Sequence, residues 1–184
     1  MNQKNEIQPD QQTIDDILNL FKSGKLNNAK IKIENCIKKF PKSFVLFNVL
    51  GAICVGQDEL EAAINHHKKS IEINPDYAEG YNNLGIAFQK LGLFEEAIKN
   101  YKKTLKLKPN FAPTYNNLGV ALKCLNKLDE ALMNSKKAIE LDPKFADAHN
   151  NIGEILEDLG KYEEAYKFYK KAIKLKSNYS GAYN

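Results

Sequence analysis

The apolar residues of this chain recur with the period of an α-helix. Tyr81, Leu84 and Phe88 fall at positions i, i+3 and i+7, which lie on one face of a helix. After a short Leu-Gly break the pattern resumes with Ala97 and Tyr101. Polar residues fill the remaining positions of both segments. Two amphipathic helices joined by a tight turn are therefore predicted, and each packs its apolar face on the other as a helical hairpin.

The same hairpin pattern recurs every 34 residues. Four columns of residues keep this spacing: Pro41, Pro75, Pro109 and Pro143; Gly51, Gly85, Gly119 and Gly153; Ala63, Ala97, Ala131 and Ala165; Ile71, Leu105, Ile139 and Ile173. Proline cannot continue a helix, so each proline closes one hairpin. Small residues at the glycine and alanine columns predict that the two helix backbones of a hairpin approach closely. Internal repetition at this period is typical of a solenoid.

These residues resemble the tetratricopeptide-repeat family. Y-N-N-L-G at 81–85 and 115–119, H-N-N-I-G at 149–153, the later alanine and the closing proline all fit the family's pattern. The resemblance covers about residues 10–184. It implies an all-α fold, a right-handed α-solenoid of stacked antiparallel helix hairpins with a 34-residue period.

The repeat pattern divides the chain into a polar tail at 1–9, a solenoid at 10–179 and the start of a further repeat at 180–184. The repeats are 10–43, 44–77, 78–111, 112–145 and 146–179. The first repeat is divergent, because Ile17 stands where later repeats have glycine, yet Ala29 and Pro41 are kept. The chain shows no evident polar cap at its C-terminal end, which suggests either a fragment of a longer protein or a surface that pairs with another copy.

The resemblance also implies where a ligand binds. In the family, the face of each first helix opposite the core stripe lines a concave groove. At 100° per residue this face carries two asparagine ladders, Asn48, Asn82, Asn116, Asn150 and Asn184 in one and Asn83, Asn117 and Asn151 in the other. We also place Lys90, Lys123, Glu154, Glu157 and Asp158 there. Side-chain amides suit the main chain of an extended peptide, although codon bias toward asparagine explains the ladders equally well.

The predicted groove changes from apolar residues in the first full repeat, 44–77, to acidic residues in the last repeat, 146–179. This gradient predicts a bound segment with an apolar anchor toward Val49 and Val55 and a basic residue near the carboxylates. The alternative is that the carboxylates form an ordinary solvated face and the valines pack on the divergent first repeat, 10–43.

Charge and composition exclude several other classes. The net charge is only +4 and every basic residue is a lysine, which disfavours specific nucleic-acid binding. The first ten residues do not resemble a secretion signal and no apolar run is long enough to cross a membrane, so we expect a cytoplasmic protein. Three cysteines and three histidines lack metal-ligand spacing, so no metal and no cofactor are expected.

The sequence therefore predicts a protein-interaction scaffold that binds a protein or peptide partner, rather than an enzyme. No catalytic motif is present in the 184 residues. The asparagine ladders are also similar to the repeat arrays of O-linked N-acetylglucosamine transferases, so a recognition segment of a larger enzyme is one alternative. Self-association through the C-terminal end is another. A family site for chaperone C-termini needs basic residues where Asn48, Pro113 and Asn117 stand, and is disfavoured.

Overall fold

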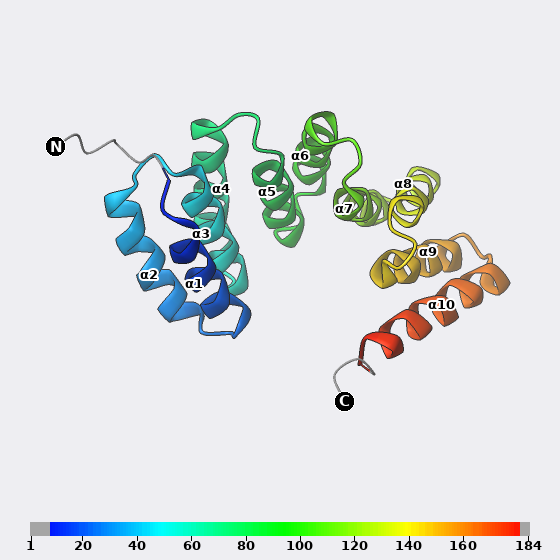
Figure 1. Ribbon diagram of the computed structural model, residues 1–184. Coiled ribbons are helices and arrows are strands. Elements are labelled where there is room, and N and C mark those ends of the chain that lie inside the picture. Colours follow the sequence, from blue (N-terminus) through cyan, green and yellow to red (C-terminus); the bar gives the residue numbers. More distant parts are fainter. Residues whose placement is uncertain (1–7, 181–184) are drawn as a thin grey trace. The chain divides into compact units, whose positions relative to one another are not determined.

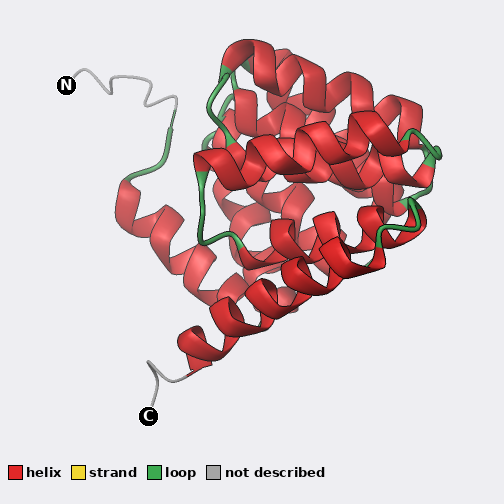
Figure 2. Cartoon of the chain, turned by 90° about the vertical axis from the view of Figure 1, so that its right-hand side faces the viewer, coloured by secondary structure: helices red, strands yellow, loops and turns green. Residues whose placement is uncertain are grey.

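The computed structural model describes residues 8–180, with side chains through Lys176, and in this part of the chain every regular element is an α-helix (Figures 1 and 2). The helices are α1 (Gln11–Lys22), α2 (Leu26–Lys39), α3 (Phe44–Gly56), α4 (Leu60–Ile73), α5 (Ala78–Lys90), α6 (Phe94–Leu107), α7 (Ala112–Cys124), α8 (Leu128–Leu141), α9 (Ala146–Asp158) and α10 (Tyr162–Ser180). The predicted all-α class is confirmed. First helices begin 34 residues apart from Phe44 onward, which confirms the period.

The helices form two compact units, Met1–Leu91 and Gly92–Asn184. In the first unit α1 packs on α2, α3 packs on α4, and α5 packs on both α4 and α3. In the second unit α7 packs on α8 and α9 packs on α10, while α6 packs on α7 and α8 on α9. First helices also touch each other directly, α3 with α5 and α7 with α9. Each unit is therefore a stack of two hairpins and one further helix, α5 in the first unit and α6 in the second.

A left-handed residue closes every hairpin at the same repeat position. The φ angles are 73° at Gly24, 62° at Asp58, 75° at Gly92, 57° at Asn126 and 73° at Gly160. The next amide donates back across the turn, as in the 2.9 Å bond from the Glu59 N–H to the Cys54 carbonyl. This bond satisfies a carbonyl at the end of the first helix, and the left-handed residue is what allows the chain to reverse so tightly. Asparagine and aspartate tolerate this conformation better than other residues with a side chain.

The glycine column marks the closest approach between the helices of a hairpin. A Cβ added there would lie 2.6 Å from His67 at Gly51, 2.2 Å from Ser135 at Gly119 and 2.6 Å from Tyr169 at Gly153. Each distance is shorter than a carbon can tolerate, so the predicted role of these glycines is confirmed. The facing residue also follows the 34-residue period, but it varies in size and polarity from hairpin to hairpin.

The core of the first unit includes Ile17 and Ile33, which are 1% and 0% exposed. Ile17 takes the place of the glycine in the divergent first hairpin. Val49 and Val55 are partly buried and pack against this core, which favours the alternative over an open apolar anchor.

Helix α10 is longer than the other second helices. It spans 19 residues and continues through Ser177, which stands 34 residues after Pro143. The missing proline explains why the helix does not stop there. The predicted start of a further repeat at 180–184 therefore begins at Ser180, which is still part of helix α10. The remaining residues of that repeat lie outside the described part of the chain. None of the helices in residues 8–180 combines the length and apolar character needed to cross a membrane.

Candidate functional site

The first asparagine ladder is not the exposed row that we expected. Asn48, Asn82 and Asn116 are each only 6% exposed. For Asn48 and Asn116 the cover comes partly from the next first helix, which contributes Asn83 and Asn151. The prediction that these three side chains line an open groove is therefore wrong. Asn83, Asn117, Asn150 and Asn151 are partly exposed, and Asn184 lies outside the described residues.

Asn48 lies at the centre of a buried polar network in the first unit. Its amide nitrogen donates to the Tyr77 hydroxyl over 3.2 Å, and its oxygen accepts from the Asn83 amide over 3.1 Å. The same oxygen lies 3.0 Å from His67 Nδ1. Because that oxygen is an acceptor, the proton of the neutral imidazole must be on Nδ1. Burial lowers the pKa of His67 to about 3, so the ring is neutral at physiological pH.

The second unit repeats part of this arrangement. The Asn151 amide nitrogen donates to the Asn116 oxygen over 2.8 Å, which is the same contact as that between Asn83 and Asn48. Each pair joins two successive first helices of one unit. The two ladders are thus not independent, because a partly exposed asparagine of one ladder is held by a buried asparagine of the other.

Two charged residues of the predicted site in the second unit, Lys123 and Glu154, form an ion pair. Lys123 Nζ lies 2.5 Å from one oxygen of Glu154, and the Asn150 amide donates to the other oxygen over 2.7 Å. Both charged side chains stay partly exposed, at 24% and 40%. The Glu154 carboxylate is therefore neutralised within the fold, which weakens the predicted acidic end of the groove.

The rest of the predicted acidic end lies at the last turn of α9. Glu157 accepts a 2.7 Å bond from the Tyr169 hydroxyl, and Asp158 is exposed. Burial and the contact with Glu157 raise the pKa of Tyr169 to about 12. Lys90, at the end of α5, is exposed as well. These three charged groups keep access to solvent.

Sequence reasoning missed His67 and Tyr77 as members of the polar network. The signal was present in the repeat, because His67 falls in the column that faces glycine and is followed there by Tyr101, Ser135 and Tyr169. The other buried histidine, His149, sits 3.0 Å from the Pro143 carbonyl through Nε2. Cys54 is fully buried, and burial raises the pKa of its thiol to about 11, which makes it a poor nucleophile.

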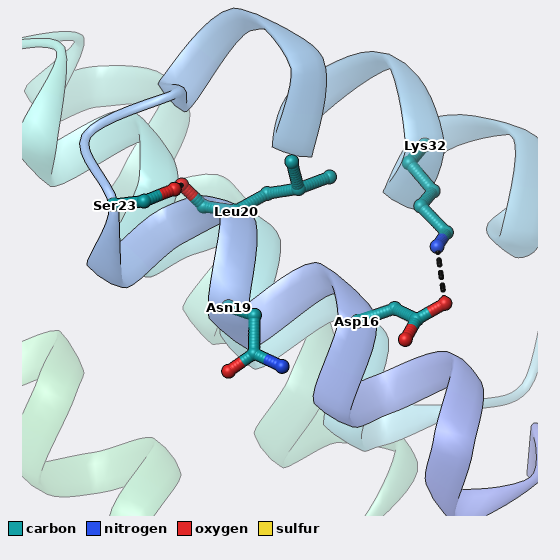
Figure 3. Close-up of a pocket in the computed structure, with 5 residues that line it drawn as sticks. All are labelled: Asp16, Asn19, Leu20, Ser23 and Lys32. Atoms are coloured by element: carbon teal, nitrogen blue, oxygen red, sulfur yellow. Dashed lines mark hydrogen bonds and ion pairs between the residues drawn. The ribbon is translucent and has the colours of Figure 1, made fainter.

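A shallow hollow of 440 Å³ lies on a different part of the first unit, over α1 and α2 (Figure 3). It is lined by Asp16, Asn19, Leu20, Ser23 and Lys32, and none of the predicted site residues borders it. Lys32 spans it to reach Asp16 over 2.7 Å. In residues 8–180, no three acidic, histidine or cysteine side chains are placed together to hold a metal ion.

The repeat, the hairpins and the paired first helices define a class, the helical-repeat solenoids. Tetratricopeptide-repeat models match residues 78–111 and 146–179, 51–92 and 124–160, and 100–133. Together these matches run without a gap from residue 51 to residue 179. The chain belongs to the tetratricopeptide-repeat family.

Two curated relatives match less than half of the chain. The STIP1 homolog of Dictyostelium discoideum is 33% identical over 75 residues, which are 41% of this chain and 13% of that protein. The UDP-N-acetylglucosamine–peptide N-acetylglucosaminyltransferase of Giardia intestinalis is 31% identical over 74 residues, 39% of this chain and 5% of that protein. The chain thus corresponds to a small part of each relative.

Solved structures resemble the fold over most of its length. MamA superposes with a TM-score of 0.74 at 24% identity, covering 89% of this chain and 95% of that chain. PilF of Pseudomonas aeruginosa gives 0.81 at 19% identity, with 89% and 74% covered. YrrB, described as a TPR protein with an unusual peptide-binding site, gives 0.67 at 21% identity, with 94% and 88% covered. At these identities the likeness concerns the fold alone.

Proposed function

We propose that this chain is a protein-interaction module that binds an extended peptide segment on the face of its first helices and performs no catalysis itself. Membership of a family of helical scaffolds supports an interaction role, and the description of YrrB as a peptide-binding protein of similar fold points the same way. A cytoplasmic location stays a prediction from the sequence.

The observation that carries the proposal is the bond between Asn151 and Asn116. It holds the partly exposed Asn151 amide in one orientation on the α7–α9 face of the second unit. An amide nitrogen carries two N–H groups, so Asn151 retains a second donor beyond this bond. An oriented donor loses little conformational entropy when a ligand carbonyl binds, which favours recognition of main chain. Asn117, on the same face, is a second partly exposed amide.

The charges on this face suggest a ligand with only a modest charge preference. Lys123 and Glu154 neutralise each other, so their effect on a ligand is smaller than that of two separate charges. Glu157 and Asp158 remain exposed at the end of α9 and favour a basic residue near that end. We therefore expect the peptide main chain to supply most of the affinity and a lysine or arginine to set the direction of binding.

Fluorescence anisotropy with an array of extended peptides at two salt concentrations tests this proposal. For the best peptide, N-methylation of alternate backbone amides should weaken binding more than exchange of its side chains. The Asn151→Ala variant should lose about 2- to 10-fold in affinity, which is the effect of one hydrogen bond. Asn134→Ala is the matched control, because this amide lies on second helix α8 and bonds to the Glu130 carbonyl. Equal losses for both variants would contradict the proposal.

A second candidate is substrate recognition within a larger glycosyltransferase-like enzyme. The match to the Giardia transferase favours it, since the repeats of this chain resemble a short part of that protein. Sequencing the gene beyond both ends of these 184 residues tests it directly. A transferase domain in the same reading frame would support this candidate, and a reading frame without one would exclude it.

A further inference from the structure

A hollow of 360 Å³ opens on the α7–α8 hairpin, inside the second unit. It is lined by Tyr115 of α7 and by five residues of α8, which are Met133, Asn134, Lys136, Lys137 and Glu140. Tyr115 and Asn117 are two positions apart, so they point to opposite sides of α7. The hollow is therefore separate from the first-helix face on which we place peptide binding.

The apolar side of this hollow includes an exposed methionine. Met133 is 65% exposed, which is unfavourable for a large apolar side chain in water. The same repeat column holds a polar residue in the other full repeats, namely Asn65, Lys99 and Lys167. A methionine side chain is flexible and polarizable, so it adapts to apolar groups of different shape. Met133 is thus a candidate contact for an apolar group of a ligand.

The Tyr115 ring also borders the hollow, because this hairpin lacks a ring that covers the same position in two other hairpins. Those covering pairs are Phe47 with His66 and His149 with Phe168, whose ring centroids lie 6.4 and 6.0 Å apart. Asn134 stands in the column of the covering ring, and its amide donates to the Glu130 carbonyl of its own helix over 2.8 Å. Tyr115 and Met133 therefore give the hollow an aromatic and an aliphatic wall.

Lysines give the mouth of the hollow a positive charge. Lys137 Nζ lies 2.7 Å from a Glu140 oxygen, whereas exposed Lys136 is in no ion pair among the described residues. The neighbouring second helices α6 and α10 carry four lysines in 97–107 and five in 165–176, with no acidic residue in either segment. Helices α6 and α8 both pack on α7, and α8 and α10 both pack on α9. This side of the unit attracts an acidic ligand and repels a basic one.

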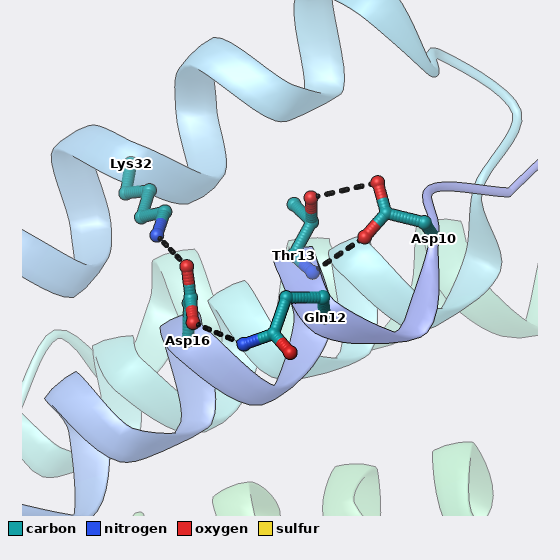
Figure 4. A network of polar contacts seen from close by, with 5 residues as sticks. All are labelled: Asp10, Gln12, Thr13, Asp16 and Lys32. Atoms are coloured by element: carbon teal, nitrogen blue, oxygen red, sulfur yellow. Dashed lines mark hydrogen bonds and ion pairs between the residues drawn. The ribbon is translucent and has the colours of Figure 1, made fainter.

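The hollow over α1 and α2 lacks this combination. Lys32 is bonded there to Asp16 over 2.7 Å, and Asp16 also accepts from Gln12 over 2.8 Å (Figure 4). These contacts hold the pKa of the Asp16 carboxyl below its ordinary value, so the group is charged at neutral pH. A carboxylate ligand would have to compete with Asp16 for the lysine that borders that hollow.

We propose that the α7–α8 hollow binds an acidic segment of another protein. One large apolar side chain of that segment contacts Tyr115 and Met133, and a neighbouring carboxylate pairs with Lys136. A nucleic acid fits less well, because the chain has no arginine to read phosphate and Glu140 repels a phosphate backbone. The first-helix face is expected to prefer a basic residue, so the charge of a peptide distinguishes the two sites.

Fluorescence anisotropy with a labelled peptide, one phenylalanine between pairs of glutamates, tests the site. Exchange of the phenylalanine for glycine, or of the glutamates for lysine, should weaken binding by about tenfold or more. Met133→Asn introduces the residue of the α4 column and should cost about tenfold, and Lys136→Glu about three- to tenfold. Ile31→Asn on α2 is the matched control, since Ile31 is 61% exposed and lies in the first unit.

Circular dichroism should show unchanged helix content in all three variants, because each replaced side chain is exposed. Equal losses for Met133→Asn and Ile31→Asn would overturn the proposal, as would equal binding of the three peptides. Asn151→Ala should keep its affinity for the acidic peptide. This result would separate the hollow from the first-helix face, whereas a loss would place the acidic peptide on that face and overturn the proposal.

The methyl signal of Met133 locates the site directly, since the other methionine of the chain is Met1. In protein with labelled methionine methyl groups, the signal absent from Met133→Asn should shift as the acidic peptide binds. Saturable binding that leaves this signal in place would overturn the proposal. An oligouridylate is the second probe, and it should leave the methyl signal unmoved. A shift as large as that caused by the peptide would assign the hollow to nucleic acid instead.

Discussion

Two buried asparagines, Asn48 of the first unit and Asn116 of the second, have the same repeat position but different surroundings. Asn48 contacts His67, Tyr77 and Asn83. Asn116 accepts from Asn151, but the residues at the two other positions are Ser135 and Phe145. Phenylalanine has no hydroxyl group, and serine is too short to replace the imidazole.

From this difference we expect one repeat column to serve two purposes. In the first unit the polar network is extensive and buried, so the asparagine pair mainly contributes to stability. In the second unit the pair has fewer internal partners and lies beside the partly exposed Lys123–Glu154 ion pair. We therefore expect the first pair chiefly to stabilise the fold and the proposed ligand to bind chiefly at the second pair.

The largest effect is expected from alanine at the buried asparagine of each unit. Asn48→Ala leaves the buried His67 and Tyr77 without a shared partner, which should lower the free energy of unfolding by about 3 kcal/mol. Asn116→Ala removes the acceptor of Asn151 and should cost about 1 kcal/mol. Urea denaturation followed by circular dichroism measures both values. Equal losses would remove the distinction between the two units.

Acid should destabilise the first unit through His67. Its pKa is near 3 when folded and 6.5 ordinarily, so the folded protein binds fewer protons. The stability it contributes is complete above pH 6.5 and is lost as the pH falls from 6.5 toward 3, at about 1.4 kcal/mol per pH unit. Burial also lowers the pKa of His66, so His67→Tyr is needed to isolate the effect. The variant should show a shallower slope in urea titrations between these pH values, and an unchanged slope would refute the assignment.

A smaller and opposite effect is expected at Ser135 in the second unit. The Ser135 hydroxyl is buried and has no hydrogen-bond partner among the described residues. Ser135→Ala removes an unsatisfied polar group and should raise the free energy of unfolding by up to about 1 kcal/mol. Ser70→Ala is the control, because Ser70 donates a 2.8 Å bond to the Phe44 carbonyl and its loss should destabilise. Thermal unfolding of both variants gives the comparison, and destabilisation by Ser135→Ala would be inconsistent with an idle hydroxyl.

The smallest effect should be the same in both units. Asp58 and Asn126 hold the left-handed turn position that is glycine in the other hairpins. Replacing either by glycine relieves a modest backbone cost and should stabilise by about 0.5 kcal/mol. Differential scanning calorimetry measures this change. Clearly different results at the two sites would show that the units differ in their turns as well as in their polar networks.

Most of the fold follows from residue spacing. The proline, glycine and alanine columns set the period, the hairpin and the close approach of helices, because each depends on the backbone or on residue size. The extent of α10 was missed at its C-terminal end, where Ser177 replaces the proline. The family pattern predicted another repeat from residue 180, but the sequence lacks the proline at position 177 that would stop the helix before it.

The candidate site was predicted less well for a physical reason. A helical-wheel argument gives a first helix one covered face, toward its own hairpin partner. In the stack a first helix is also covered by the next first helix, as α3 is by α5 and α7 by α9. Asn48 and Asn116 lie under that second contact, while Asn83 and Asn151 lie at its edge. Pairing of Lys123 with Glu154 also depends on this packing and not on spacing within one helix.

Side-chain amide NMR spectra, recorded while the best array peptide is added, give the sharpest test of peptide binding on the second unit. The amide signals of Asn151 and Asn117 should shift as the peptide binds, while the signal of Asn48 should stay in place. Exchange of the Asn48 amide protons with solvent should be slow throughout. A shift at Asn48 with none at Asn151, or saturable binding that moves neither, would contradict the assignment of binding to the second unit.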